Sequence, residues 1–263
     1  MSQVSTVIRK EWEDGMRNKT VLSVVIIVPL VMTALPVIML FVMSRTPVNA
    51  QDMEEMGKVL SNPAFAGMNP IEAIQTSMSS FMMILFLMMP LMVPMTIAAY
   101  SIVGEKVSRS LEPLLAAPIT TSRLLVAKGL AAAIPGIGMA WICYALFLIC
   151  ARFLAASDRV FAFFVDPMWL IAMFVLSPLL TIMAVNVGII VSSRTSDPRA
   201  AEQLGSLVVL PLMVLLFGPM VGLIMLNSTT FWISSAIVAL VDVGLVYLGV
   251  ALFQRETILT RWK

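Results

Sequence analysis

Residues 104–128 read GEKVSRSLEPLLAAPITTSRLLVAK and separate two long apolar runs. The stretch is too polar to cross a membrane, because six of its side chains are charged. It nevertheless carries a short apolar cluster of its own, formed by Leu111, Leu114 and Leu115. A polar segment with an apolar face, set between lipid-soluble runs, is suited to contact something soluble.

The composition is that of a membrane protein. The 263 residues are 60% hydrophobic and 12% charged, whereas soluble domains carry about 25% charged residues. Long uncharged runs at this composition predict an all-α, polytopic membrane protein. Histidine is absent and only two cysteines occur, so we expect no metal site. The basic residues are scattered over the loops and not gathered in a patch, which argues against nucleic acid as a partner.

Six apolar runs are long enough to cross a hydrocarbon core of roughly 30 Å as helices. The expected spans are residues 20–43, 79–103, 128–150, 167–191, 204–226 and 231–253. The remaining segments are an N-terminal segment at 1–19, an outer loop at 44–78 and a polar loop at 104–127. We see no internal repeat, so residues 1–263 form a single transmembrane domain.

Lysine and arginine indicate the orientation, because cytoplasmic loops carry an excess of them. Thirteen of the 17 cationic residues fall on one side, in segments 1–19, 104–128, 192–203 and 254–263. The other side holds Arg45, Lys58, Arg152 and Arg159. We therefore expect both termini and the 104–127 loop in the cytoplasm, with the chain in the cell membrane.

The N-terminal segment has its own helical pattern. Apolar side chains recur on one helical face, at Val4, Val7, Ile8, Trp12 and Met16. A basic amphipathic helix with a tryptophan is typical of the membrane interface; the alternative is a solvated helix that frays. A second helix start is expected at Asn69-Pro70, with asparagine as the N-cap and proline at the first helical position.

Two observations bear on chemistry. The chain contains no GxxxxGK[ST] or GxSxG motif, so we expect no ATP site or serine nucleophile of its own and no enzyme activity. Asp242 is the one acidic residue clearly inside a span, and it shares a helical face with Ser235 and Ala239 that we expect to point inward. An intramembrane carboxylate is a functional candidate by default; a protonated or hydrogen-bonded structural role is the alternative.

The polar loop resembles a known family. Glu105 to Pro118, followed by Lys128-Gly129, is similar to the EK-x-x-G-[ST]-LE-x-LL-x-[ST]P…GK stretch of type-2 ABC exporter permeases. Arg109 stands where the family often has glycine, and Ala117 stands where it often has serine or threonine. The resemblance extends to the six spans, the cytoplasmic ends and the N-terminal amphipathic segment.

The resemblance implies a transmembrane subunit of an ATP-driven exporter, coupled to a separate ATP-binding subunit. It implies two copies of each subunit, with this permease as a homodimer, and ATP and Mg on the partner, with no cofactor in this chain. The N-terminal helix would lie among membrane lipids. The coupling residues it implies form a helix in the loop: Glu105, Arg109, Leu111, Glu112, Leu114, Leu115 and Pro118.

Two other functions remain open on the sequence. A self-sufficient ion-coupled carrier that uses Asp242 predicts transport without an ATPase. A membrane assembly protein predicts neither a translocation path nor stimulation of a partner's ATPase. The sequence does not choose the transported substrate.

Labelling of single cysteines tests the orientation. Cysteines placed in residues 50–70 or near Ser157 should react with a membrane-impermeant maleimide added to intact cells, because these segments are expected outside. Cysteines near Ser196 and at the C-terminal end should stay unlabelled. The parent chain, with Cys143 and Cys150 in an apolar run, gives the background, and external labelling at Ser196 would reverse the orientation.

Overall fold

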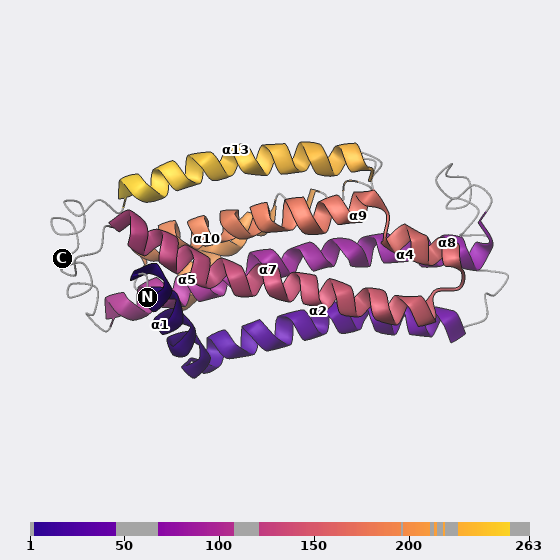
Figure 1. Ribbon diagram of the computed structural model, residues 1–263, viewed down its shortest axis with the longest axis horizontal. Helices are drawn as coiled ribbons and strands as arrows, with labels where there is room; N and C mark the ends of the chain where they lie inside the picture. The colour runs from indigo at the N-terminus through magenta and orange to yellow at the C-terminus, as the bar shows by residue number, and fades with distance from the viewer. Residues whose placement is uncertain are drawn as a thin grey trace.

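The described part of the chain is a bundle of long helices. This computed structural model describes residues 3–45, 68–107, 121–195, 197–210, 213, 214, 218 and 226–252. The longer helices lie side by side along the long axis, and α1 crosses one end of the bundle (Figure 1). In chain order the elements are α1 (Gln3–Arg17), α2 (Lys19–Arg45), α4 (Pro70–Leu85), η2 (Phe86–Met88), α5 (Met89–Val107), α7 (Thr121–Leu154), α8 (Asp158–Phe164), α9 (Pro167–Ile171), the π-helical turn η3 (Ala172–Leu176), α10 (Ser177–Arg194), α11 (Pro198–Gly205), η4 (Ser206–Val208) and α13 (Ser228–Leu252).

Five helical stretches are long and apolar enough to cross a membrane. They are Lys19–Arg45, Ile71–Val107, Arg123–Leu154, Asp158–Arg194 and Ser228–Gly249. They correspond to the first four expected spans and the sixth. Most of the expected span at 204–226 lies outside the described residues; within it, α11 ends at Gly205 and η4 follows.

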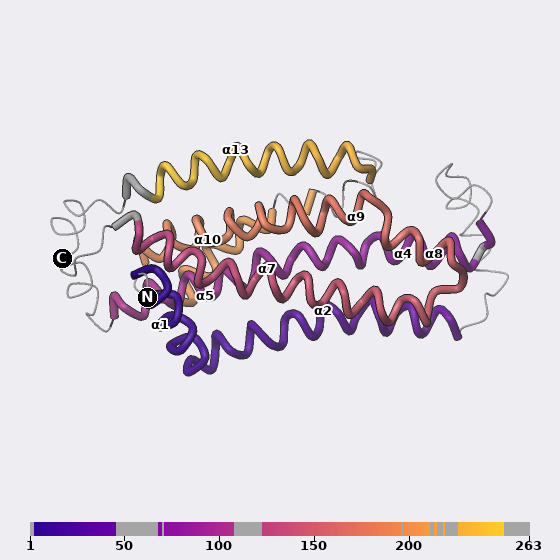
Figure 2. Tube along the Cα trace, viewed as in Figure 1, coloured from indigo at the N-terminus to yellow at the C-terminus, as the bar shows by residue number. Residues whose placement is uncertain are grey.

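The described spans run in the order that an alternating topology requires. The start of α1, the end of α5, the start of α7 and the end of α13 all lie at the same end of the bundle (Figure 2). We call this the α1 end. The two residues that border the polar loop, Val107 and Thr121, are therefore at the α1 end as well.

The second span begins earlier than expected. Residues 70–78 were assigned to the outer loop, but helix α4 starts at Pro70. The predicted N-cap at Asn69 is confirmed, and the backbone N–H of Asn69 donates to Glu72 Oε2 at 2.9 Å. A glutamate at the third helical position that reaches back to the N-cap satisfies a backbone donor that the helix leaves free. Because of this cap, the helix begins before the apolar run expected at residues 79–103.

Aromatic side chains hold together the half of the bundle away from α1. Phe147 of α7 packs against Phe86 and Phe164, with ring centroids 5.4 and 5.2 Å apart. Trp169 of α9 packs against Phe231 of α13 at 5.7 Å. All five rings are fully buried. Offset and edge-to-face aromatic pairs contribute about 0.5–1.5 kcal/mol beyond their buried area, and here they connect α7, α8, α9, η2 and α13.

The π-helical turn is followed by a proline, and one backbone carbonyl there lacks a backbone donor. In π-helical register, residue 178 would donate its N–H to the carbonyl of Met173, but Pro178 has no N–H to give. The backbone N–H of Ser177 does follow this register and bonds to the carbonyl of Ala172. The indole Nε1 of Trp141 donates to the freed Met173 carbonyl at 2.9 Å. A side chain from α7 therefore supplies the hydrogen bond that a backbone carbonyl of the neighbouring span lacks.

Glycines let α5 and its neighbours approach closely. A Cβ on Gly188 of α10 would lie 3.0 Å from both Ala98 Cβ and Met95 Sδ of α5. A Cβ on Gly136 of α7 would lie 2.7 Å from Pro94 Cγ. Small residues at helix contacts are how spans pack when the surrounding lipid gives no hydrophobic driving force.

Gly136 therefore cannot be enlarged without moving a rigid ring. Gly136→Ala should lower the free energy of unfolding by about 1–3 kcal/mol, the usual cost of overpacking a core. Gly138→Ala is the matched control, because a Cβ there has no heavy atom within 4 Å. The measurement is thermal unfolding of the purified chain in detergent. Equal melting temperatures for the two variants would contradict the close packing of α5 on α7.

Candidate functional site

Four ionised side chains meet at the α1 end of the bundle. Lys128 Nζ lies 2.6 Å from Glu11 Oε1 and 2.8 Å from Glu105 Oε2. Lys10 Nζ lies 3.0 Å from Glu105 Oε1. We call Lys10, Glu11, Glu105 and Lys128 the charge cluster. It joins α1, α5 and α7, three elements that are far apart in sequence.

The centre of the charge cluster is shielded from solvent. The side chains of Lys128, Glu11 and Glu105 are only 4%, 7% and 9% exposed. Lys128 also donates to Ser101 Oγ at 2.8 Å, so its ammonium group makes two hydrogen bonds, to Glu11 and Ser101, besides the ion-pair contact with Glu105. A buried ion pair is stable only when such partners replace the lost water. The geometry meets that requirement around Lys128.

Lys10 closes the charge cluster from the solvent side. Its side chain is 46% exposed and also lies 3.9 Å from Asp14. Burial alone lowers the pKa of Lys10, but the hydrogen bond and charge of Glu105, with Glu11 and Asp14, outweigh that effect and raise the pKa. A lysine with a raised pKa contributes stability that persists below its ordinary value of about 10.4 and is lost only as the pH rises above it. Lys10 is therefore charged throughout the neutral range.

The sequence places Glu11 inward by helical periodicity. Val4, Val7 and Ile8 of α1 are half-buried, and Glu11 continues their ridge one turn later. The α1 helix is present, but its apolar face is divided. Trp12 and Met16 are 42% and 68% exposed and do not join the packed ridge. A charged residue therefore takes the most buried position on α1.

The charge cluster brackets the polar loop. Glu105 lies three residues before the undescribed residues 108–120, and Lys128 lies eight residues after them. Lys106 provides a further tie, since its Nζ donates to the backbone carbonyls of Ser193 and Thr195 at 3.3 and 3.0 Å. A lysine at the last carbonyls of a helix satisfies acceptors that lack a partner within that helix. Both ends of the loop therefore start from fixed positions.

Of the residues expected to couple to an ATPase, the structure describes Glu105. It lies in the charge cluster and is buried. The others fall outside the described residues: Arg109, Leu111, Glu112, Leu114, Leu115 and Pro118. Sequence reasoning missed Glu11 and Lys10 and treated Lys128 only as the first residue of an expected span. The available signals were an acidic residue in line with an apolar ridge and a lysine at the start of an apolar run.

Asp242 is far from the charge cluster along the chain, and the buried stripe that contains it is mainly apolar. Its side chain is 6% exposed, in line with the expectation that it faces inward. The buried stripe on α13 comprises Phe231, Ser235, Val238 and Asp242, whereas Val246, one turn further on, is 46% exposed. Neither carboxylate oxygen of Asp242 has a hydrogen-bond partner among the described residues. An ionised carboxylate in such a place is costly.

The comparison with known families decides the identity. The sequence profile described as ABC-2 family transporter protein matches residues 5–252, nearly the whole chain. The chain belongs to the ABC-2 transporter family. No curated protein sequence matches this ABC-2 family protein significantly. The profile match confirms the expected membership of the ABC-2 type permease family.

Membership assigns a general role to the bundle. This ABC-2 family protein is a multi-pass membrane protein with a permease role in transport, which agrees with its five described apolar spans. The matched region includes nearly all of α1, both borders of the polar loop and all of α13. The charge cluster therefore lies inside the family domain.

Lys128 is the side chain on which the charge cluster depends. Lys128→Met should lower the free energy of unfolding by about 3–5 kcal/mol, because it leaves two carboxylates buried beside an apolar group. Lys10→Met is the matched control and should cost less than about 1 kcal/mol, since Lys10 is half-exposed and screened by solvent. Thermal unfolding of the purified variants measures both. Similar losses for the two variants would show that burial does not govern this charge cluster.

Proposed function

We propose that this chain is the transmembrane subunit of an ATP-driven exporter and forms its translocation path. The proposal is supported by family membership and by one observation above all: the charge cluster ties both borders of the polar loop to α1. A separate subunit binds and hydrolyses ATP with Mg, and this chain holds no ATPase site. The segment between α5 and α7, within the expected loop at 104–127, is the contact with that subunit.

Coupling in this proposal is mechanical. The apolar cluster of Leu111, Leu114 and Leu115 docks on the ATP-binding subunit, with Glu112 among its charged neighbours. When ATP binding moves the loop, the displacement reaches α5 through Glu105 and α7 through Lys128. Because the charge cluster fixes α1 to the same two helices, the three helices move together at the α1 end.

The assembly proposed here has two copies of this permease as a homodimer and two ATP-binding subunits. The α1 end faces the cytoplasm, in agreement with the distribution of lysine and arginine. Helix α1 lies in the cytoplasmic interface of the cell membrane, beside the point where α2 enters the bilayer. Its exposed Trp12 and Met16 support that placement.

Asp242 is proposed to line the translocation path. Its burial and its lack of a partner among the described residues support a role beyond packing, because a purely structural carboxylate would be expected to have a hydrogen-bond donor nearby. The same observation supports the second candidate function, an ion-coupled carrier that uses Asp242. The non-transporting assembly protein has no comparable support in the site.

Co-purification with the ATP-binding subunit tests the proposal. The chain is co-expressed with a candidate ATP-binding subunit that carries a Walker motif, and the yield and ATPase activity of the complex are measured. Leu114→Asp and Glu112→Arg should each reduce the recovered ATPase at least about tenfold, because an unpaired charge in a packed contact costs several kcal/mol and 1.4 kcal/mol is a factor of ten. Both variants should insert into the membrane normally.

Arg194→Glu is the matched control, since it reverses an exposed charge at the end of α10, outside the loop. It should retain the wild-type yield. Wild-type recovery and activity with both loop variants would reject the docking role of the loop. Transport that continues with a hydrolysis-deficient ATPase, and is lost in Asp242→Asn, would favour the ion-coupled carrier.

A further inference from the structure

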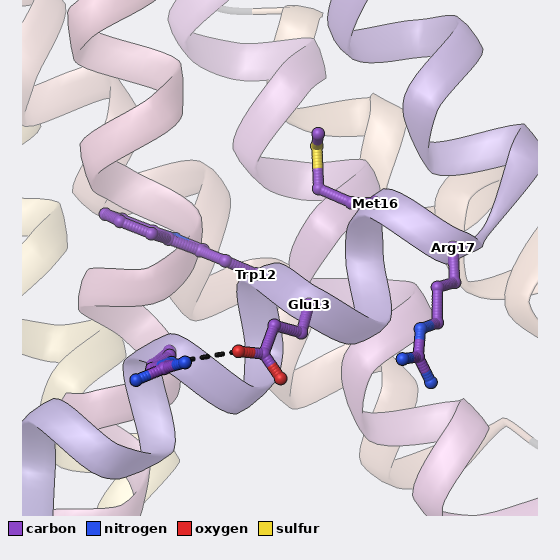
Figure 3. A pocket seen from close by; sticks show the side chains of 5 residues that line it. Trp12, Glu13, Met16 and Arg17 are labelled. Atoms are coloured by element: carbon purple, nitrogen blue, oxygen red, sulfur yellow. Dashed lines mark hydrogen bonds and ion pairs between the residues drawn. The ribbon is translucent and has the colours of Figure 1, made fainter.

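The outer face of α1 has a combination of side chains that the charge cluster does not use. Arg9, Trp12, Glu13, Met16 and Arg17 line a shallow hollow of about 380 Å³ (Figure 3). Trp12 extends toward α7, where its Nε1 donates to the carbonyl of Ala131 at 2.9 Å. The indole is therefore held in place while part of its surface stays exposed.

The charge of the hollow is positive. Arg9 Nε lies 2.9 Å from Glu13 Oε1, so this pair is neutral as a unit. Arg17 has no partner among the described residues and is exposed, and Lys19 is exposed one residue beyond Asn18. The five lining residues thus carry one excess positive charge next to the apolar surface of Trp12 and Met16.

The charge cluster fixes the direction of this face. Glu11 lies on the opposite side of α1, where Lys128 holds it at 2.6 Å, so α1 cannot rotate to bury Met16 without breaking the buried ion pairs. Only Asn18 separates α1 from α2, and its side chain accepts from the N–H groups of Thr20 and Val21 at the start of α2. The hollow is therefore held next to the first turn of a span of which only 17% is buried in the bundle.

We propose that this hollow is a binding site for the headgroup of an anionic phospholipid. The phosphate of the lipid lies against Arg17, and its glycerol and upper acyl carbons cover Trp12 and Met16. A lipid with one net negative charge matches the excess charge of the lining, whereas a zwitterionic lipid leaves it uncompensated. Cationic side chains close to a span attract anionic lipids, and tryptophan is favoured at the same depth.

This inference rests on the proposed placement of α1 at the membrane surface, but it adds the class of ligand. It also predicts whether a change at Glu13 strengthens or weakens the binding of an anionic lipid. Glu13 neutralises Arg9, so it limits the attraction for anions at this site. Removing its charge should strengthen the binding of an anionic lipid, and removing Arg17 should weaken it.

The test uses the purified full-length chain in a neutral detergent. The rise in melting temperature is followed as phosphatidylglycerol or phosphatidylcholine is added, and the half-saturating concentration of each lipid is recorded. Arg17→Gln should raise the half-saturating concentration of phosphatidylglycerol about five-fold, and Glu13→Gln should lower it about five-fold, since one cation near the surface contributes about that factor. Phosphatidylcholine should respond to neither change.

Arg194→Gln removes an exposed cation at the same end of the bundle and should leave both lipids unaffected. Shifts of the same sign in Arg17→Gln and Glu13→Gln, or equal shifts in Arg17→Gln and Arg194→Gln, would overturn the site. If both lipids stabilise the wild type at the same concentration, α1 contacts lipid without headgroup preference. Because the measurement needs no ATPase subunit, its failure is separate from a failure of the coupling proposal.

Discussion

Lys128 has to satisfy its charge inside the bundle, and it does so with one carboxylate from α1 and one from α5. A buried ammonium group without partners costs several kcal/mol, so the three helices cannot separate independently at this end. The position of α1, the borders of the polar loop and the direction of the hollow on α1 all depend on this arrangement. The charge cluster thus constrains how α1, α5 and α7 pack against one another.

The two halves of the bundle are held together by different interactions. Away from α1, buried aromatic rings connect α7, α8, α9 and α13 through contacts that have no charge. At the α1 end, the helices are held together by ion pairs and by a lysine bonded to helix-terminal carbonyls. Polar contacts from α1, α5, α7 and the end of α10 therefore meet at the α1 end.

The charged residues of the described spans divide into satisfied and unsatisfied groups. Glu105 and Lys128 form ion pairs with residues on other helices. Asp242 is buried without a hydrogen-bond partner among the described residues, in a stripe that is otherwise mainly apolar. Uncompensated burial in a span is retained when a group binds something or is held neutral. This contrast supports the proposals that Asp242 lines the path and that the charge cluster transmits the coupling motion.

The helical fold, the positions of five spans and the cap at Asn69 followed from the chain alone, because hydrophobic runs and capping residues act within a few turns of sequence. The face of α1 was only half right: Val7 and Ile8 turn inward, but the most buried position belongs to Glu11. No local pattern could have paired Glu11 with Lys128, which is 117 residues away and joins it only when α1 crosses α7. The hydrogen bond between Trp141 and Met173 could not be predicted for the same reason. A proline leaves a carbonyl without its donor locally, but the new donor comes from another span. Periodicity and capping are properties of one helix, whereas the partners of a buried charge are set by how several helices pack, and that was decided by the tertiary structure.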